Sequence, residues 1–401
     1  MPNFTRLKDC VVTNKNVIVR VDINVPMRDG KIEDDTRIRA VIPTLRYLAE
    51  QKAKVIVISH FGRPEGKVEP SMSIRPLIER VQELLGLAIK VSFVDDCIGD
   101  KPRAAIAAAN YGDVIMLENL RFYKQETKND PAFAQELASF ANLYVNDAFS
   151  CSHRAHASIV GIPAILKSCA GFLLEAELDN LTNLLENAKK PMMAVVGGAK
   201  VSTKLDLLNS LVFKAQSLVV GGGMANSFLY AMGKNIGKSL CEKDLKNEVL
   251  EIIKKANLAR CPILLPLDVV VTKKFEQNAI CRTASIDDVQ DDEIIADIGA
   301  TSINYLENAL KKHETLLWNG PLGAFEIKPF NIATDSFAAV AAALTKEKKL
   351  LSIAGGGDVV SALNSAGLAQ DFTYISTAGG AFLEWLEGKE LPGVTAISGK
   401  L

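Results

Sequence analysis

The sequence predicts an α/β protein built from two doubly wound parallel sheets, and three observations support this. At 401 residues the chain is too long for one ordinary hydrophobic core, so two domains are expected. Short apolar runs alternate with longer helical patterns along the whole chain, which is typical of parallel, doubly wound sheets. The apolar runs are continuous and do not alternate with polar residues, so we expect strands buried on both faces.

The expected strands form one set in each half of the chain. The first set is residues 17–21, 55–58, 91–94, 114–117 and 143–145. The second set is residues 193–196, 218–220, 263–265, 315–317, 350–353 and 373–375. Each set suits a Rossmann-like domain with helices on both faces of its sheet.

The segment between the two sets, residues 171–186, predicts an amphipathic helix of about four turns. Its leucines recur at helical spacing: Leu174, Leu178, Leu181 and Leu185. Such a helix is a natural connector between two domains, although the pattern alone also fits an ordinary surface helix.

The composition narrows the class of function. A hydrophobic content of 48% with 23% charged residues is typical of a globular chain. The net charge of −1 gives no overall basic field, so neither nucleic acid nor a membrane surface is an expected partner. The seven cysteines are scattered and never spaced C-x-x-C, which favours reduced thiols over zinc ligands or disulfides. With no signal-peptide pattern and no apolar stretch near the roughly 18 residues of a membrane span, we expect a cytoplasmic protein.

Two lysines lie where they are unfavourable for stability. Lys200 and Lys204 follow an expected strand and the glycine pair 197–198, at the predicted start of a helix at Val201. Cations there oppose the helix dipole, and like charges four residues apart repel by a few tenths of a kcal/mol. Free amides with two ammonium groups suit the phosphates of a nucleotide. The alternative is a pair of solvated surface lysines.

The loops that leave the strand C-termini differ between the two halves. In open parallel sheets these loops form the functional site. In the first half they carry polar and cationic side chains: Asp22, Asn24, His60, Arg63, Arg121 and Arg154. In the second half they carry glycine: Gly222, Gly355, Gly356, Gly357, Gly379 and Gly380. We therefore expect an arginine-lined anion site in one domain and a nucleotide site with backbone amides in the other.

The arginines are the strongest of these candidates. Arg63, Arg121 and Arg154 could each form a surface ion pair, but at equivalent strand ends they converge, and guanidinium groups suit phosphate. Arg37 opens a predicted helix where a cation opposes the dipole, so we also interpret it as functional. Arg39, two positions on, faces elsewhere and is expected to pair with nearby acidic residues.

The remaining candidates point to a reaction that needs little proton transfer. Of the four histidines, His60, His153 and His156 lie in the anion loops, and His313 lies in an ordinary surface run. No nucleophile elbow or zinc-protease motif occurs, which favours phosphoryl exchange between a phosphate and a carboxylate.

Two acidic residues in the second half have open roles. Glu326 could bind ribose hydroxyls or be a solvated surface residue. Asp358 could cap the next helix or hold a magnesium ion.

Nine segments, taken together, closely resemble the phosphoglycerate kinase family from about residue 17 to residue 393. They are residues 20–26, 59–64, 117–122, 146–149, 153–156, 197–201, 318–321, 355–358 and 386–389. The resemblance implies reversible transfer of the acyl phosphate of 1,3-bisphosphoglycerate to Mg-ADP, which gives ATP and 3-phosphoglycerate in glycolysis. It also implies a hinge-bending monomer with a cleft between its domains.

The same resemblance implies roles for individual residues. The phosphoglycerate would be bound by Asp22, Asn24, Arg37, His60, Arg63, Arg121 and Arg154. The nucleotide would be bound by Lys200, Lys204, Gly222, Glu326, Gly355, Gly356, Gly357, Asp358 and Val359, with Glu326 on the ribose and Asp358 on the metal. The catalytic groups would be Arg37, Lys200, Gly357 and Gly380.

The implied domains are a phosphoglycerate-binding domain at 1–170, a connecting helix at 171–190 and a nucleotide-binding domain at 191–390. The tail 391–401 would pack back on the first domain.

Two positions depart from the family pattern. Val359 stands where a threonine or serine is usual, which removes a hydroxyl that could cap a helix or donate to a phosphate. Ala378 replaces the first of three glycines, and alanine still permits close approach if its φ is negative.

Two rival functions are a nicotinamide-dependent dehydrogenase and a two-domain anion-binding protein without chemistry. The first lacks the glycine fingerprint and its acidic partner. Only an activity measurement excludes the second.

Overall fold

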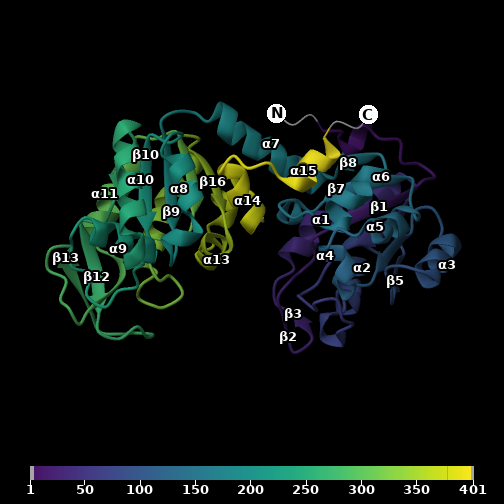
Figure 1. Ribbon diagram of the computed structural model, residues 1–401, viewed down its shortest axis with the longest axis horizontal. Helices are drawn as coiled ribbons and strands as arrows, with labels where there is room; N and C mark the ends of the chain where they lie inside the picture. Colours follow the sequence, from purple (N-terminus) through teal and green to yellow (C-terminus); the bar gives the residue numbers. More distant parts are fainter. Residues whose placement is uncertain (1–3, 377, 399–401) are drawn as a thin grey trace. The chain divides into compact units, whose positions relative to one another are not determined.

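The computed structural model describes residues 4–376 and 378–398, without the side chains of 183–187, and divides the chain into two compact units (Figure 1). The first unit runs to Thr182 and includes the chain again from Glu390, and the second is Asn183–Lys389. Both units are α/β, which confirms the predicted fold class. Among the described residues, no helix is both long and apolar enough to cross a bilayer.

The first unit contains a parallel six-stranded sheet of order β5-β6-β4-β1-β7-β8. Its strands are β1 (Asn16–Val21), β4 (Lys54–Ile58), β5 (Val91–Val94), β6 (Val114–Leu117), β7 (Leu143–Asp147) and β8 (Ser168–Ala170). Its helices include α1 (Thr36–Glu50), α2 (Ile78–Leu85), α3 (Asp100–Ala108), α4 (Lys124–Thr127), α5 (Pro131–Ala138) and α6 (Ile162–Ile165). All five strands predicted for this half are present, but β8 and the hairpin β2 (Met27–Arg28) and β3 (Lys31–Ile32) were not predicted.

The second unit contains a parallel six-stranded sheet of order β11-β10-β9-β15-β16-β17. Its strands are β9 (Met192–Gly197), β10 (Ser217–Gly221), β11 (Ile263–Leu264), β15 (Thr315–Asn319), β16 (Leu351–Gly355) and β17 (Tyr374–Ser376), which match the six predictions. Its helices include α8 (Leu205–Leu211), α9 (Gly222–Ala231), α10 (Lys246–Leu258), α11 (Ala300–Leu310), α12 (Ile332–Lys346), α13 (Gly357–Ser365) and α14 (Gly379–Leu386).

A separate antiparallel sheet of order β13-β12-β14 in this unit was not predicted. Its strands are β12 (Asp268–Thr272), β13 (Cys281–Ser285) and β14 (Ile294–Ile298). The edge strand β13 buries only Ala284, so its sequence lacks the apolar signal on which strand prediction depends.

Helix α7 (Phe172–Asn187) is the amphipathic helix predicted between the two strand sets. Leu174, Leu178 and Leu181 are fully buried, and Leu185 lies outside the described side chains. The division between the two units falls within this helix, after Thr182.

The C-terminal helix α15 (Pro392–Ile397) packs within the first unit against β8 and α6 (Figure 1). The Gly393 amide donates to the Ser152 carbonyl at 2.8 Å. A Cβ at Gly393 would lie 2.9 Å from Ser152 Cα, so glycine is needed for this contact.

Asp147, at the end of β7, caps the first turn of α7. Its Oδ1 accepts hydrogen bonds from the amides of Leu173 at 2.9 Å and Leu174 at 3.2 Å. Because the carboxyl group is fully buried, its pKa is raised from 3.8 to about 7. The native state therefore holds a proton between about pH 4 and pH 7 that the unfolded chain releases.

Replacing Asp147 with asparagine should remove a pH-dependent part of the stability. In the wild type this contribution to the free energy of unfolding is on the order of a few kcal/mol. It is present at low pH and is lost as pH rises toward 7. Asparagine keeps the acceptor oxygen but does not titrate, so the variant should gain stability over the wild type as pH rises from 5 to 8. Urea unfolding at both pH values measures this, with Asp29→Asn as an exposed control. An equal difference at the two pH values would contradict the prediction.

Candidate functional site

The first unit has a cavity of about 520 Å³ at the carboxyl edge of its sheet. It is lined by the three arginines that the sequence singled out, Arg63, Arg121 and Arg154, together with Lys124, Lys128 and His156. The arginines follow β4, β6 and β7, so the parallel topology brings them together as predicted.

Arg121 shows that this cavity carries an excess of positive charge. Its side chain is 8% exposed, and Nη1 donates to the Gly62 carbonyl at 2.7 Å. Burial, with Arg154 and Arg20 nearby, lowers the pKa of Arg121 to about 10. Cations that destabilise one another in a hollow favour a bound anion.

Asp22, Asn24 and Arg37 form one hydrogen-bonded network. Asp22 Oδ2 accepts from Arg37 Nη1 at 3.0 Å and from Ser150 Oγ at 2.5 Å. Arg37 Nη1 also donates to the Asn24 carbonyl at 3.1 Å, and Asn24 Oδ1 accepts from the Gly62 amide at 2.9 Å. The network fixes Arg37 in the first turn of α1 while its side chain stays 37% exposed.

His60 is held as a neutral hydrogen-bond donor. Its ring is 5% exposed, and Nδ1 lies 3.0 Å from Arg20 Nη2. Arginine can only donate, so Nδ1 accepts and the proton lies on Nε2. Burial, with Arg20 nearby, keeps the pKa of His60 well below its ordinary value.

Arg20 is a residue of this site that sequence reasoning did not single out. It lies in β1, is buried, and also donates to Ser158 Oγ at 2.9 Å. A lone arginine inside an apolar strand was the available signal. Its contact with Nδ1 orients the His60 ring.

The pKa values of the other two histidines of this site, His153 and His156, are also lowered. Burial and the cations Arg121 and Arg20 lower the pKa of His156 to about 4. Burial, with Arg154 nearby, lowers the pKa of His153 as well. The positive charge at this site near neutral pH therefore comes from arginine and lysine.

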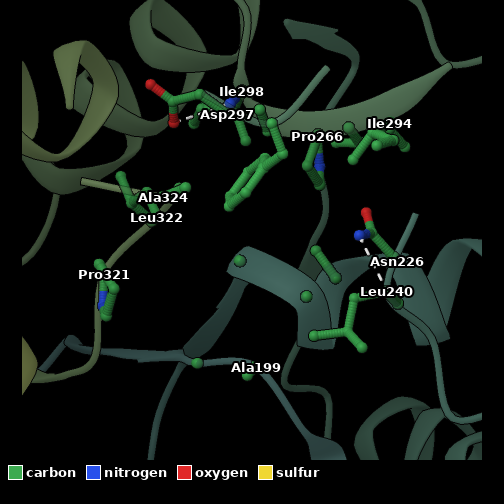
Figure 2. A pocket seen from close by; sticks show the side chains of 18 of the residues that line it. Ala199, Asn226, Leu240, Pro266, Ile294, Asp297, Ile298, Pro321, Leu322 and Ala324 are labelled. Atoms are coloured by element: carbon green, nitrogen blue, oxygen red, sulfur yellow. Dashed lines mark hydrogen bonds between the residues drawn. The ribbon is translucent and has the colours of Figure 1, made fainter. Parts of the chain in front are cut away.

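The second unit has its own cavity, of about 540 Å³, between the start of α9 and the loop that follows β15 (Figure 2). Most of its wall is apolar: Leu240, Pro266, Phe275, Ile294, Ile295, Ala296, Ile298 and Leu322. Glu326, Asp358 and Lys238 add charge. An apolar slot with a few polar groups suits a nucleoside.

Three helices of this unit begin at the carboxyl edge of the sheet without a side-chain cap. They are α9, α13 and α14, with Gly221, Gly356 and Ala378 as their N-cap residues. In α13 and α14 the amides of the first turn are therefore available to an anion, whereas in α9 the amides of Gly222 and Met224 already donate to the carbonyls of Leu322 and Gly198. A Cβ at Gly357 or Gly379 would meet no atom within 4 Å, so both lie beside open space, and Gly380 is exposed.

Some glycines assigned to nucleotide binding also have a structural reason to be glycine. Gly222 has φ +64°, and a Cβ there would lie 2.9 Å from the Gly198 carbonyl oxygen, although Gly222 also lines the cavity. Gly356 has φ +104° and lies against Asn319 Nδ2. Gly355 is buried, and a Cβ there would lie 2.6 Å from the Phe382 ring.

The predicted arrangement of the two lysines is wrong. A 3-10 turn (Val201–Thr203) follows Lys200, and α8 begins only at Leu205. Lys204 turns toward the sheet edge, where Nζ donates to the Gly197 carbonyl at 2.6 Å and to Asn319. Burial lowers the pKa of Lys204 to about 8, although Asp358 opposes this. Lys200 remains exposed, so the two do not form a repelling pair on one helix face.

The capping alternative for Asp358 is also wrong, because Gly356 is the N-cap of α13 and Asp358 is the second helical residue. Its exposed carboxylate lines the cavity, and carboxylate oxygens are ligands that suit Mg²⁺. Val359 is buried in the hydrophobic core, so its side chain does not line the cavity, but its amide belongs to the free first turn. Ala378 has φ −103°, an ordinary value for alanine.

Comparisons with known proteins point to one family. The family model described as "Phosphoglycerate kinase" matches residues 7–389. Phosphoglycerate kinase of Methylorubrum populi is 51% identical to this chain over 401 residues, and the match covers 100% of each chain. That of Mesorhizobium japonicum is 52% identical over 386 residues, with 96% of each chain covered.

Solved structures agree with these relatives. The structure of phosphoglycerate kinase from Coxiella burnetii matches with a TM-score of 0.88 and 39% identity, and covers 98% of both chains. That from Pyrococcus horikoshii matches with a TM-score of 0.83 and 31% identity over 98% of both chains.

Proposed function

The chain belongs to the phosphoglycerate kinase family, and we propose how its residues divide the work of that family's reaction. The reaction is the reversible, Mg²⁺-dependent transfer of a phosphoryl group from 1,3-bisphosphoglycerate to ADP, which gives ATP and 3-phosphoglycerate in glycolysis. The acceptor of the reverse reaction is a carboxyl group.

The arginine-lined cavity of the first unit binds the phosphoglycerate. Arg63, Arg121 and Arg154 bind its phosphate, since they line one hollow. His60 donates from Nε2, and Arg20 fixes the tautomer that makes this possible. Asp22 and Asn24 hold Arg37 and the Gly62 loop in place.

The second unit binds the nucleotide. The base enters the apolar cavity, the ribose reaches Glu326, and the phosphates meet the free amides of α13 and α14. Lys200 binds the moving phosphoryl group, while Lys204 joins the carboxyl ends of β9 and β15. Asp358 holds Mg²⁺, which supplies charge neutralisation on the nucleotide phosphates when it is bound.

The chemistry needs no proton transfer. An acyl phosphate leaves a carboxylate behind, and the attacking ADP oxygen is already anionic, so the residues place two polyanions in line and neutralise charge. Arg37 and the amides of Gly357 and Gly380 join Lys200 in this task. Arg37 and Lys200 belong to different units and would act on the same phosphoryl group, so the reacting complex needs both units at that group, which is the domain closure that the family resemblance implies.

The observation that carries this proposal is the division of chemistry between the units, with clustered guanidinium groups in one and uncapped helix starts beside an apolar slot in the other. A coupled assay for ATP formation tests it. The purified chain with 1,3-bisphosphoglycerate, ADP and Mg²⁺ should form ATP, and omission of Mg²⁺ should abolish it. If the folded chain binds both ligands but forms no ATP, the result would favour the binding-protein alternative.

We also propose that the protein works as a cytoplasmic monomer. Its seven cysteines are free thiols, as a reducing compartment favours. The monomer is what the resemblance to the family implies.

A further inference from the structure

Among the described side chains that line the apolar cavity of the second unit, Asn226 carries a buried polar atom without a hydrogen-bond partner. Asn226 lies on α9, lines this cavity and is 2% exposed. Its Nδ2 donates to the Leu240 carbonyl at 3.2 Å. No described residue donates a hydrogen bond to its Oδ1.

The contact with Leu240 fixes which way the amide points. A carbonyl oxygen can only accept, so the amide nitrogen must face it and the oxygen must face away. In Figure 2 the Asn226 nitrogen is joined to Leu240 and the oxygen points away from it, on the side of Ile294. The neighbouring walls, Leu240, Ile294 and Ile295, have apolar side chains.

A buried acceptor without a donor is unfavourable, and a ligand that brings the donor recovers the loss. The proposed function places a nucleobase in this cavity, and the present inference rests on that placement. Adenine carries an exocyclic amine at position 6. Guanine and hypoxanthine carry an oxygen there, which would face the Asn226 oxygen as a second acceptor.

We propose that Asn226 Oδ1 accepts a hydrogen bond from the 6-amino group of adenine and makes Asn226 a specificity-determining residue of this enzyme. A site built to bind an N–H group discriminates against analogues that lack it, because its own polar atom is then left unpaired. The apolar walls bind any purine face and supply affinity without this discrimination.

Kinetics with four nucleoside diphosphates test the proposal without any change to the protein. At position 6 ADP carries an amine, IDP and GDP carry an oxygen, and purine riboside diphosphate carries only hydrogen. The wild type should use ADP with a kcat/KM at least about tenfold above the other three. Equal use of ADP and purine riboside diphosphate would overturn the proposal and would indicate that water satisfies Asn226. Equal use of GDP would also overturn it.

The variant Asn226→Leu supplies the second measurement. Leucine has a similar size and no acceptor, so the kcat/KM for ADP should fall to that for purine riboside diphosphate. The kcat/KM for purine riboside diphosphate should itself change less than about threefold. A preserved preference for ADP would exclude Asn226 as its source. Retained binding of 3-phosphoglycerate checks that the variant is folded.

Leu240→Ala is the matched control, because it removes an apolar wall that every base shares. It should lower kcat/KM by the same factor for all four nucleotides. One outcome is that Leu240→Ala lowers kcat/KM for all four nucleotides while Asn226→Leu leaves the preference for ADP intact. In that case the base lies in the cavity, and only the proposed selection by Asn226 fails. If Leu240→Ala affects none of them, the base binds elsewhere, and the proposed nucleotide placement fails together with this inference.

Discussion

Replacing Lys200 with alanine should lower kcat by about 10²–10³-fold, the usual effect of removing one group that stabilises transition-state charge. The affinity for 3-phosphoglycerate should change less than about twofold, because Lys200 belongs to the second unit and the arginine cavity is lined by residues of the first. The loss should therefore appear in kcat and not in phosphoglycerate binding. Steady-state kinetics and a separate titration with 3-phosphoglycerate measure the two quantities.

Lys254→Ala is the control for this prediction. Lys254 is an exposed lysine on α10 whose Nζ lies 3.6 Å from Glu251, so its removal tests the general loss of one positive charge from the same unit. It should leave kcat nearly unchanged. A Lys200→Ala enzyme with near-normal turnover would refute the role assigned to Lys200.

The parallel sheets could be predicted from sequence because both faces of their strands are buried. A continuous apolar run such as residues 55–58 needs no alternation to be recognised, and it forms the fully buried β4. The edge strand β8 has three small residues, and β13 faces solvent over most of its length, so neither carries that signal. An apolar run predicts a strand only where the strand is buried on both faces. Strands β8 and β13 form because they pair with neighbouring strands, which their own sequences do not show.

The candidate site was predictable where topology alone places a side chain. Arg63, Arg121 and Arg154 lie together because parallel strands end at one edge. The role of Arg20 was not predictable, because it acts through His60 from within a strand. The orientation of Lys204 depends on Asn319, a residue more than a hundred positions away, which no local pattern reveals.

Replacing Arg37 with alanine should lower kcat by about 10²–10³-fold and also raise the KM for 3-phosphoglycerate. Arg37 is proposed to act on the transferring group, and the same guanidinium binds Asp22 and the Asn24 carbonyl at the edge of the phosphoglycerate site. Its loss therefore removes charge stabilisation and loosens the loop that carries Asn24. Arg37→Lys keeps the charge but not the planar donor geometry, so it should recover only part of kcat.

Arg39→Ala separates this effect from a change in α1 itself. Arg39 is two residues away on the same helix and binds Asp35 at 2.8 Å, as the sequence predicted for a structural arginine. Its loss should affect stability by at most about 1 kcal/mol and leave kcat within about twofold. If both variants lose turnover equally, the defect lies in the start of α1, and the chemical role of Arg37 fails. If only Arg37→Ala does, the neighbouring arginines differ because one guanidinium is bound within the helix and the other is directed by Asp22 toward the reacting groups.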